Sequence, residues 1–217
     1  RGTFRPVTKV NLDMLECARK RFTETSGIAG EDIVVLFEVT MKNLLKEGEL
    51  DKADFLARVD TLGALGHNVL ISNYPEYYRL SAYFRRYTRE PIVIVLGPNN
   101  LLEIFNTRYY SHLDGGTLEA CGRLFKEDVR LFVYPMIGER FNAYLHHRGQ
   151  QTAEDLHLGD VGPETIVSAD TLPVSDDQKL LYRYLVERGD IVPLENYRRG
   201  DLGIVAGDVS ASSDDHA

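Results

Sequence analysis

Short apolar runs alternate along the chain with longer segments in which apolar residues recur at helical spacing. The runs are rich in β-branched residues and do not alternate with polar positions, a pattern typical of parallel strands buried on both faces. They lie at 33–37, 68–72, 92–96 and 129–134. The segments with helical spacing lie at 12–22, 51–65, 75–87, 100–105, 117–126 and 176–188. This alternation predicts an α/β fold with a parallel sheet and helices on both faces.

The remaining segments are predicted to be less regular. Residues 138–165 are polar and contain several glycines, which indicates a loop or small insertion. Residues 210–217 are predicted to form a disordered tail. We expect residues 1–209 to form a single domain, because a chain of 217 residues with 43% hydrophobic side chains can bury a sizeable core. The chain begins at Arg1 inside what reads as a motif, so we also expect an upstream segment.

Charge and cysteine content narrow the functional classes. The net charge of −8 argues against a general nucleic-acid-binding protein, which needs surplus positive charge. No apolar run has the length of a membrane span and no secretory signal is visible, so we expect a cytoplasmic protein without membrane contact. Cys17 and Cys121 lie on predicted helices without metal-ligand or C-x-x-C spacing. We expect both to be buried thiols that form no disulfide.

The most informative stretch precedes the first predicted helix and reads Gly2-Thr3-Phe4-Arg5-Pro6-Val7-Thr8-Lys9-Val10-Asn11. A turn that contains glycine and proline opens a helix whose first turn carries hydroxyl, ammonium and amide groups. Unpaired backbone N–H groups and the helix dipole favour an anion at such a position. A second interpretation stays open, because Thr8 and Asn11 are also typical capping residues that satisfy the same N–H groups.

This stretch resembles the signature of the nicotinate/nicotinamide mononucleotide adenylyltransferases, G-[ST]-F-x-P-[IV]-[HT]-x-x-H-L. Residues 92–102 are similar to that family's strand followed by G-x-D-x-L, and residues 180–189 to its closing helix. The resemblance implies a three-layer, Rossmann-like nucleotidyltransferase fold. It implies transfer of AMP from ATP, with Mg²⁺, to nicotinate or nicotinamide mononucleotide in NAD biosynthesis. No protein side chain is expected to bind a metal.

The same resemblance implies roles for individual residues. Thr8 and Asn11 would donate hydrogen bonds to phosphate, and Lys9 would supply a nearby positive charge. The remaining positions would contact the nucleotide, the first three through their backbone: Gly2, Thr3, Phe4, Gly97 and Asn99. A strand before Gly2, central to such a sheet, would be supplied by an upstream segment or by a partner.

Three departures from the family pattern suggest an alternative function. Asn11 stands where the family has a histidine, Asn99 where it has an aspartate, and Pro173 where a phosphate-binding arginine is expected. Loss of one charge-assisted donor at such a site costs on the order of 10²–10³ in rate. Lys9, Arg5 and Arg1 could compensate in part as nearby cations. The alternative is a catalytically degenerate domain that serves as a protein-interaction or assembly module.

Other polar groups receive weaker interpretations. The Tyr/Arg-rich segment 75–89 is predicted to pack most of its aromatic rings on the sheet, and it could bind a protein partner or a second copy of the chain. Stacking of these rings on nucleic-acid bases is less favoured, because the chain as a whole carries a negative net charge. Three further features are weak candidates for ligand sites. The strand end at 72–73 could contact a ligand or be an ordinary turn. The glycine turn at 114–119 lacks the lysine of a P-loop, and three histidines lack metal-ligand spacing. These histidines are His146, His147 and His157.

Overall fold

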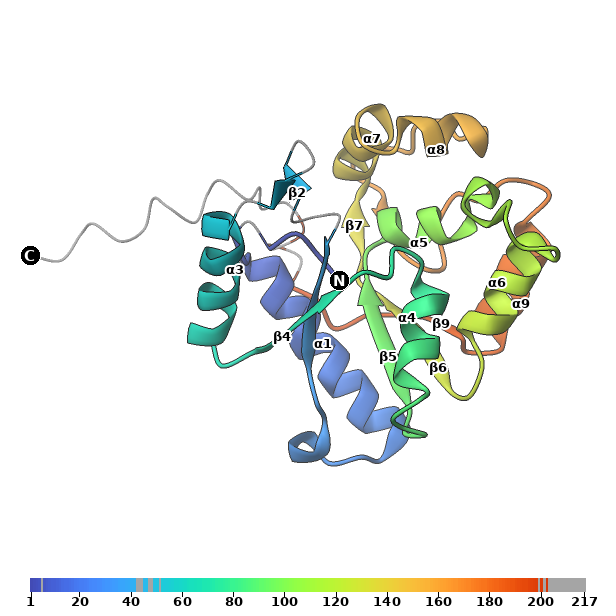
Figure 1. Ribbon diagram of the computed structural model, residues 1–217. Helices are drawn as coiled ribbons and strands as arrows, with labels where there is room; N and C mark the ends of the chain where they lie inside the picture. Colours follow the sequence, from blue (N-terminus) through green and yellow to red (C-terminus); the bar gives the residue numbers. More distant parts are fainter. Residues whose placement is uncertain are drawn as a thin grey trace, which may run out of the picture. The chain divides into compact units, whose positions relative to one another are not determined.

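The computed structural model describes residues 1–4, 6–41, 45–46, 49–50, 52–198, 200 and 202 (Figure 1). The chain divides into two compact units. The first comprises Arg1–Asn73 together with the described residues from Arg198 onward, and the second comprises Tyr74–Tyr197. Both contain helices and open sheets whose longer strands are parallel, so the predicted α/β class with parallel sheets is confirmed. Arg5 and residues 210–217 lie outside the described residues.

The first unit is built on a parallel pair of strands, β1 (Leu36–Thr40) and β4 (Asn68–Ser72). Its helices are α1 (Lys9–Ser26) and α3 (Lys52–Ala64), with a 3₁₀ turn at Gly30–Asp32. The short strands β2 (Leu45–Lys46) and β3 (Glu49–Leu50) form an antiparallel pair. Gly27 and Gly66 follow α1 and α3 in the left-handed backbone conformation that commonly ends a helix.

The strand predicted at 33–37 starts three residues later than expected. Leu36 pairs with Asn68, the first residue of β4, so the ladder has no partner for earlier residues of the run. Val34 lies before the ladder and is 76% exposed. Pairing with a distant strand therefore sets this boundary, and the apolar run alone does not.

The second unit is built on a parallel sheet with strand order β5-β6-β9. These strands are β5 (Ile92–Leu96), β6 (Val129–Val133) and β9 (Ile191–Pro193). Its helices are α4 (Tyr77–Phe84), α5 (Pro98–Phe105), α6 (Gly116–Leu124), α7 (Gly138–His146), α8 (Gln150–Asp155) and α9 (Lys179–Glu187). A 3₁₀ turn spans Thr107–Tyr110, and β7 (Met136–Ile137) pairs antiparallel with β8 (Ile166–Val167).

The core of the second unit covers one face of its parallel sheet. Alternate strand residues, among them Leu96, Leu131 and Ile191, join this core because successive side chains of a strand point to opposite faces. Helices α5, α6, α7 and α9 each contribute apolar side chains to it. A helical layer on the second face, which a three-layer fold requires, stays a prediction.

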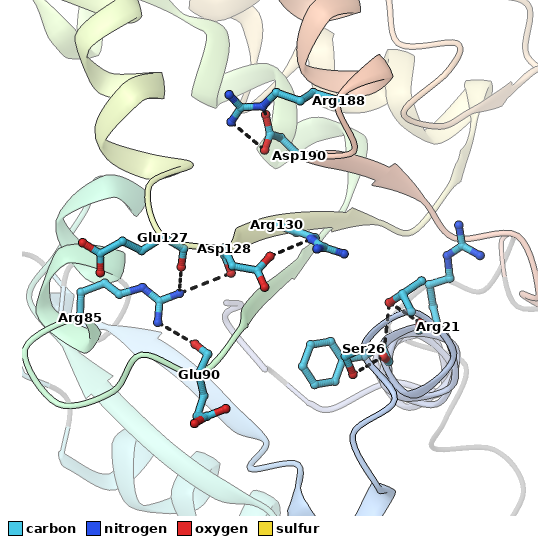
Figure 2. A network of polar contacts seen from close by, with 11 residues as sticks. Arg21, Ser26, Arg85, Glu90, Glu127, Asp128, Arg130, Arg188 and Asp190 are labelled. Carbon is cyan, nitrogen blue, oxygen red and sulfur yellow. Dashed lines mark hydrogen bonds and ion pairs between the residues drawn. The ribbon is translucent and has the colours of Figure 1, made fainter.

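An arginine connects the segments that lead into the amino ends of β5 and β6. The Arg85 guanidinium donates hydrogen bonds to the carbonyl oxygens of Glu90 (2.6 Å), Glu127 and Asp128 (3.4 Å), as Figure 2 shows. Glu127 and Asp128 are both in the left-handed conformation, with φ of 59° and 57°. Arg85 thus joins the end of α4 to the turn before β6. The helix predicted at 75–87 is shorter in the structure, where α4 ends at Phe84.

The prediction of a loop or small insertion at 138–165 missed two helices. In α7, Phe141 and Leu145 are buried one turn apart, so two apolar side chains fix an otherwise polar helix. The Asn142 amide donates to the carbonyl oxygen of Val161 at 2.8 Å and accepts from its N–H at 3.0 Å. This polar contact lies within the segment and is invisible to a hydrophobic pattern. The prediction of a single domain over 1–209 stays a prediction.

Candidate functional site

The start of α1 is closed by a capping box between Thr8 and Asn11. Thr8 has an extended backbone, and its Oγ1 accepts a hydrogen bond from the Asn11 N–H at 3.3 Å. Asn11 Oδ1 in turn accepts from the Thr8 N–H at 2.9 Å and from the Thr8 hydroxyl at 3.0 Å. The capping interpretation is therefore confirmed. The hydroxyl proton of Thr8 is directed to Asn11, so in this structure Thr8 positions Asn11 and offers no donor to a ligand.

The same capping box leaves other donors at the helix start available. Thr8 holds Oδ1 of Asn11. The Nδ2 group of the same side chain has no hydrogen-bond partner among the described residues. The backbone N–H groups of Lys9 and Val10 open the helix, where no preceding turn supplies an acceptor. The exposed Lys9 side chain adds a positive charge. These groups suit an anion with several oxygen atoms.

The turn that precedes α1 is held by the neighbouring strand and helix. The Gly2 N–H donates to the carbonyl oxygen of Glu38 on β1 at 3.1 Å, and the Thr3 carbonyl accepts from Nη1 of Arg58 on α3 at 3.0 Å. Phe4 has a φ of 48°, a strained value for an aromatic residue, and its ring packs on Phe37 with centroids 5.1 Å apart. The N–H groups of Thr3 and Phe4 have no partner within the described part of the chain. Of the three expected backbone contacts, those of Thr3 and Phe4 can still be made.

A buried ion pair lies beneath this turn. The Arg1 guanidinium contacts the Glu38 carboxylate through two hydrogen bonds, Nε to Oε2 at 2.6 Å and Nη2 to Oε1 at 3.1 Å. The Ser72 hydroxyl donates to the same carboxylate. Arg58 is 4% exposed and pairs with Asp54. Glu38 neutralises the charge of Arg1 in this structure, and the compensation expected of Arg1 stays a prediction.

Sequence analysis did not identify Glu38 and Arg58 as important to this region. A charged residue within an apolar strand and an arginine among the apolar positions of a predicted helix were the available signals. Charged side chains are rarely buried without a partner, so each position indicates a specific contact. Asp54 is four residues from Arg58, but Arg1 lies 37 residues from Glu38 and the Thr3 carbonyl lies 55 residues from Arg58, so these two contacts could not be assigned from local pattern.

In the second unit, Gly97 and Asn99 lie at the carboxyl end of β5, where α5 begins. The Asn99 side-chain oxygen lies 2.7 Å from the position that a Cβ on Gly97 would occupy, so a larger residue at position 97 would clash. The Asn99 amide has no hydrogen-bond partner among the residues that the structure describes. Ligands of open parallel sheets bind beyond the carboxyl ends of the strands, which is where this amide lies.

The segment at 166–173, where the family has its late phosphate motif, is bonded to itself. Oγ1 of Thr171 accepts from the Ser168 N–H at 2.9 Å and donates to the Ile166 carbonyl at 2.7 Å. Pro173 supplies no positive charge in place of the family's arginine. The two hydroxyl side chains therefore serve a turn, and the segment is a weak candidate for a phosphate clamp.

The glycine turn at 114–119 and one of the histidines, both weak candidates from the sequence, make contacts within the chain. The Gly115 N–H donates to the Glu119 carboxylate at 2.9 Å, and this bond is the main cause that lowers the pKa of Glu119. The start of α6 thus already holds an anion from its own chain. His146 Nε2 lies 2.9 Å from an oxygen of Asp160. Within the described ranges, no three His, Cys, Asp or Glu side chains are placed to hold a metal ion.

The Tyr/Arg-rich segment divides into a buried part and a surface cluster. Most of its aromatic rings were predicted to pack on the sheet, and of these Tyr77 and Tyr78 are buried in the core. Around Tyr83, the ring centroids of Tyr74, Tyr87 and Phe84 lie at 5.4, 5.2 and 5.8 Å. Tyr87 is 73% exposed. We call these four residues the aromatic cluster.

Comparison of the chain with protein-family models, with curated proteins and with solved structures gave no match. Among the described residues, no helix is long and apolar enough to cross a membrane. The start of α1 and the carboxyl end of β5 are therefore the two places whose geometry bears on function.

Proposed function

We propose that the protein binds nucleotide phosphate at the start of α1 and acts as an adenylyltransferase-like protein on nicotinate or nicotinamide mononucleotide and ATP. The observation that carries the proposal is the orientation of Asn11. Its oxygen is fixed by Thr8, so its amide N–H groups and the unpaired N–H groups of Lys9 and Val10 are all left available in the first turn of α1. The finer fold that goes with this proposal is a three-layer, Rossmann-like nucleotidyltransferase domain.

The proposed reaction is attack by a phosphate oxygen of the mononucleotide on the α-phosphorus of ATP. A new P–O bond forms, the bond from the α-phosphorus to pyrophosphate breaks, and pyrophosphate leaves. The protein makes no covalent bond and acts by positioning the reactants and stabilising charge. Asn11 and the first N–H groups of α1 would hold phosphate oxygens as neutral donors. Because charge-assisted donors are the stronger ones, we expect transfer to be slow.

Mg²⁺ would enter with ATP. The described residues offer no group of three acidic, histidine or cysteine side chains that could hold it, so they do not fit a resident metal site. Mg²⁺ is commonly held by substrate phosphates and water with few protein ligands, and when bound it neutralises phosphate charge. No step of the proposed reaction is assigned to it.

Isothermal titration of the full chain with ATP plus Mg²⁺, and separately with nicotinate mononucleotide, tests the proposal. The most informative variant is Asn11→Asp, because its carboxylate keeps the acceptor that Thr8 needs and replaces the donor by a negative charge. We expect at least a tenfold loss of affinity in Asn11→Asp and less than a twofold change in Lys20→Gln, an exposed control on the same helix. Unaltered binding in Asn11→Asp, or no binding by the folded parent chain, would contradict the proposal.

The second candidate function is a protein-interaction module. The aromatic cluster supports it, since tyrosine is enriched at interface hot spots and Tyr87 is exposed. The neutral Asn11 and Asn99 support it too, because they weaken the case for catalysis. Sedimentation velocity over a range of concentrations, with Tyr87→Ser as the variant, tests for a homo-oligomer. Self-association that is lost in Tyr87→Ser would favour this candidate, and a monomer at every concentration would count against it.

A further inference from the structure

A hollow of about 560 Å³ lies on the helical pair α7 and α8 in the second unit. We call it the α7/α8 hollow, and its lining residues are Leu145, His146, Gln150, Ala153, Glu154, His157, Leu158 and Asp160. The volume is in the range of small-molecule sites. Figure 1 shows α7 and α8 as neighbouring helices that follow one another in the chain. All lining residues come from the segment in which sequence analysis expected a loop or insertion.

The lining combines an aliphatic floor with an acceptor-rich rim. Leu145, Ala153 and Leu158 supply the aliphatic surface, and Leu145 is itself buried. One face of α8 and the residue His157 just after the helix line the hollow. These lining residues are Gln150, Ala153, Glu154 and His157. A ligand with both an alkyl chain and a polar end would match this division.

The charge of the lining is negative. Glu154 and Asp160 contribute two carboxylates, and no lysine or arginine is among the lining residues. One oxygen of Asp160 lies 2.9 Å from Nε2 of His146, and one oxygen of Glu154 accepts a hydrogen bond from the Gln150 side-chain amide at 3.2 Å. Each carboxylate has a second oxygen that can accept further hydrogen bonds. The hollow is therefore suited to a ligand that carries positive charge and several N–H donors.

His157 stands at a backbone position that favours glycine. It follows α8 with a φ of 53°. Its N–H donates to the backbone carbonyl oxygen of Glu154 at 3.2 Å, and the N–H of Leu158 donates to the backbone carbonyl oxygen of Ala153 at 2.9 Å. These two bonds form a Schellman motif, which usually has glycine at this position. A residue that lines a hollow in such a conformation is a candidate for a functional side chain.

From these observations we propose that the α7/α8 hollow binds an organic cation of the alkylammonium or alkylguanidinium class. The alkyl chain lies on the aliphatic floor, and the cationic end lies among the second oxygens of Glu154 and Asp160. The His157 ring closes one side of the site. This proposal is independent of nucleotide binding, since every residue it uses belongs to α7, α8 and the loop that follows.

Titration of the ¹⁵N-labelled full chain with agmatine, which carries a guanidinium and an ammonium group on a butyl chain, tests the proposal. We expect saturable amide shifts confined to the lining residues. Two matched probes separate charge from chain length: 1,4-butanediol is neutral and glutarate is anionic. Neither is expected to give saturable shifts at these residues. Saturation by either probe with the affinity of agmatine, or agmatine shifts spread over the surface, would overturn the proposal.

Variants give a second readout. Glu154→Gln removes one rim charge and keeps the shape, so we expect agmatine affinity to fall by about fivefold, as for a solvent-exposed ion pair. His157→Gly removes the ring at a position that glycine tolerates, so the fold is kept and affinity should fall. Glu164→Gln changes an exposed carboxylate outside the lining and is the control, with unchanged affinity expected. Equal loss in Glu164→Gln and Glu154→Gln would show a general charge effect and would refute the site.

Discussion

The capping box at the start of α1 makes a prediction that can be measured as a coupling energy. Thr8→Ala removes the oxygen that accepts from the Asn11 N–H and donates to Asn11 Oδ1. Loss of an N-cap side chain costs about 1 kcal/mol of stability. Asn11→Ala removes the acceptor of the Thr8 N–H and hydroxyl, and we expect a further cost of about 1 kcal/mol. Thr8→Ser keeps the hydroxyl and serves as the matched control.

The two residues share one hydrogen bond between Oγ1 and Oδ1, so their effects should not add. We expect the double variant to lose about 0.5–1 kcal/mol less than the sum of the single variants, as for other directly bonded pairs. Hydrogen exchange of the α1 amides is the assay, because it reports the stability of the first unit separately from the second. Additive effects, or a Thr8→Ser variant as unstable as Thr8→Ala, would refute the capping box and with it the orientation of Asn11.

Three further predictions concern stability and reactivity. Gly138→Ala places a Cβ 2.0 Å from the backbone carbonyl oxygen of Gly162 and should lower the free energy of unfolding in urea by about 3 kcal/mol. Gly122→Ala, within α6, places a Cβ with no atom within 4 Å and should raise that free energy by about 0.8 kcal/mol. Burial raises the pKa of Cys17 and of Cys121 to about 11. Both thiols should therefore react with DTNB at pH 8 far more slowly in the native than in the unfolded chain. Their contribution to stability should be constant below pH 9 and be lost between pH 9 and 11. His157→Gly should stabilise by about 0.5 kcal/mol, because relief of the left-handed strain exceeds the added freedom of the unfolded chain; a loss of stability would contradict the strain argument.

Strands built on short apolar runs were predictable from the sequence. The runs at 68–72 and 92–96 are strands with the bounds that the apolar pattern gave. The buried Cys17 and Cys121, which form no disulfide, were also predicted correctly. The helices α7 and α8 were not predicted, since two buried residues of α7 and a side-chain to backbone bond from Asn142 hold a segment that is otherwise polar. Hydrophobic periodicity gives only a weak signal for a helix that has two buried apolar residues in an otherwise polar segment.

The candidate site was predictable only where its contacts are local. Thr8 and Asn11 are three residues apart, so both their capping geometry and their place at a helix start followed from sequence. The pairing of Arg1 with Glu38 joins residues far apart in the chain and was not predicted. Long-range ion pairs leave no periodic signal, which is why the charge available to a phosphate could not be counted from the sequence.

The most direct test of the central claim is the side-chain amide signal of Asn11 in a ¹⁵N–¹H spectrum of the full chain, followed during titration with nicotinate mononucleotide. If phosphate binds at the start of α1, this signal and the backbone signals of Lys9 and Val10 shift together and saturate at one dissociation constant. If the mononucleotide binds and these three signals stay in place, or if the folded protein shows no binding at all, the start of α1 is a capped helix end and not a phosphate site.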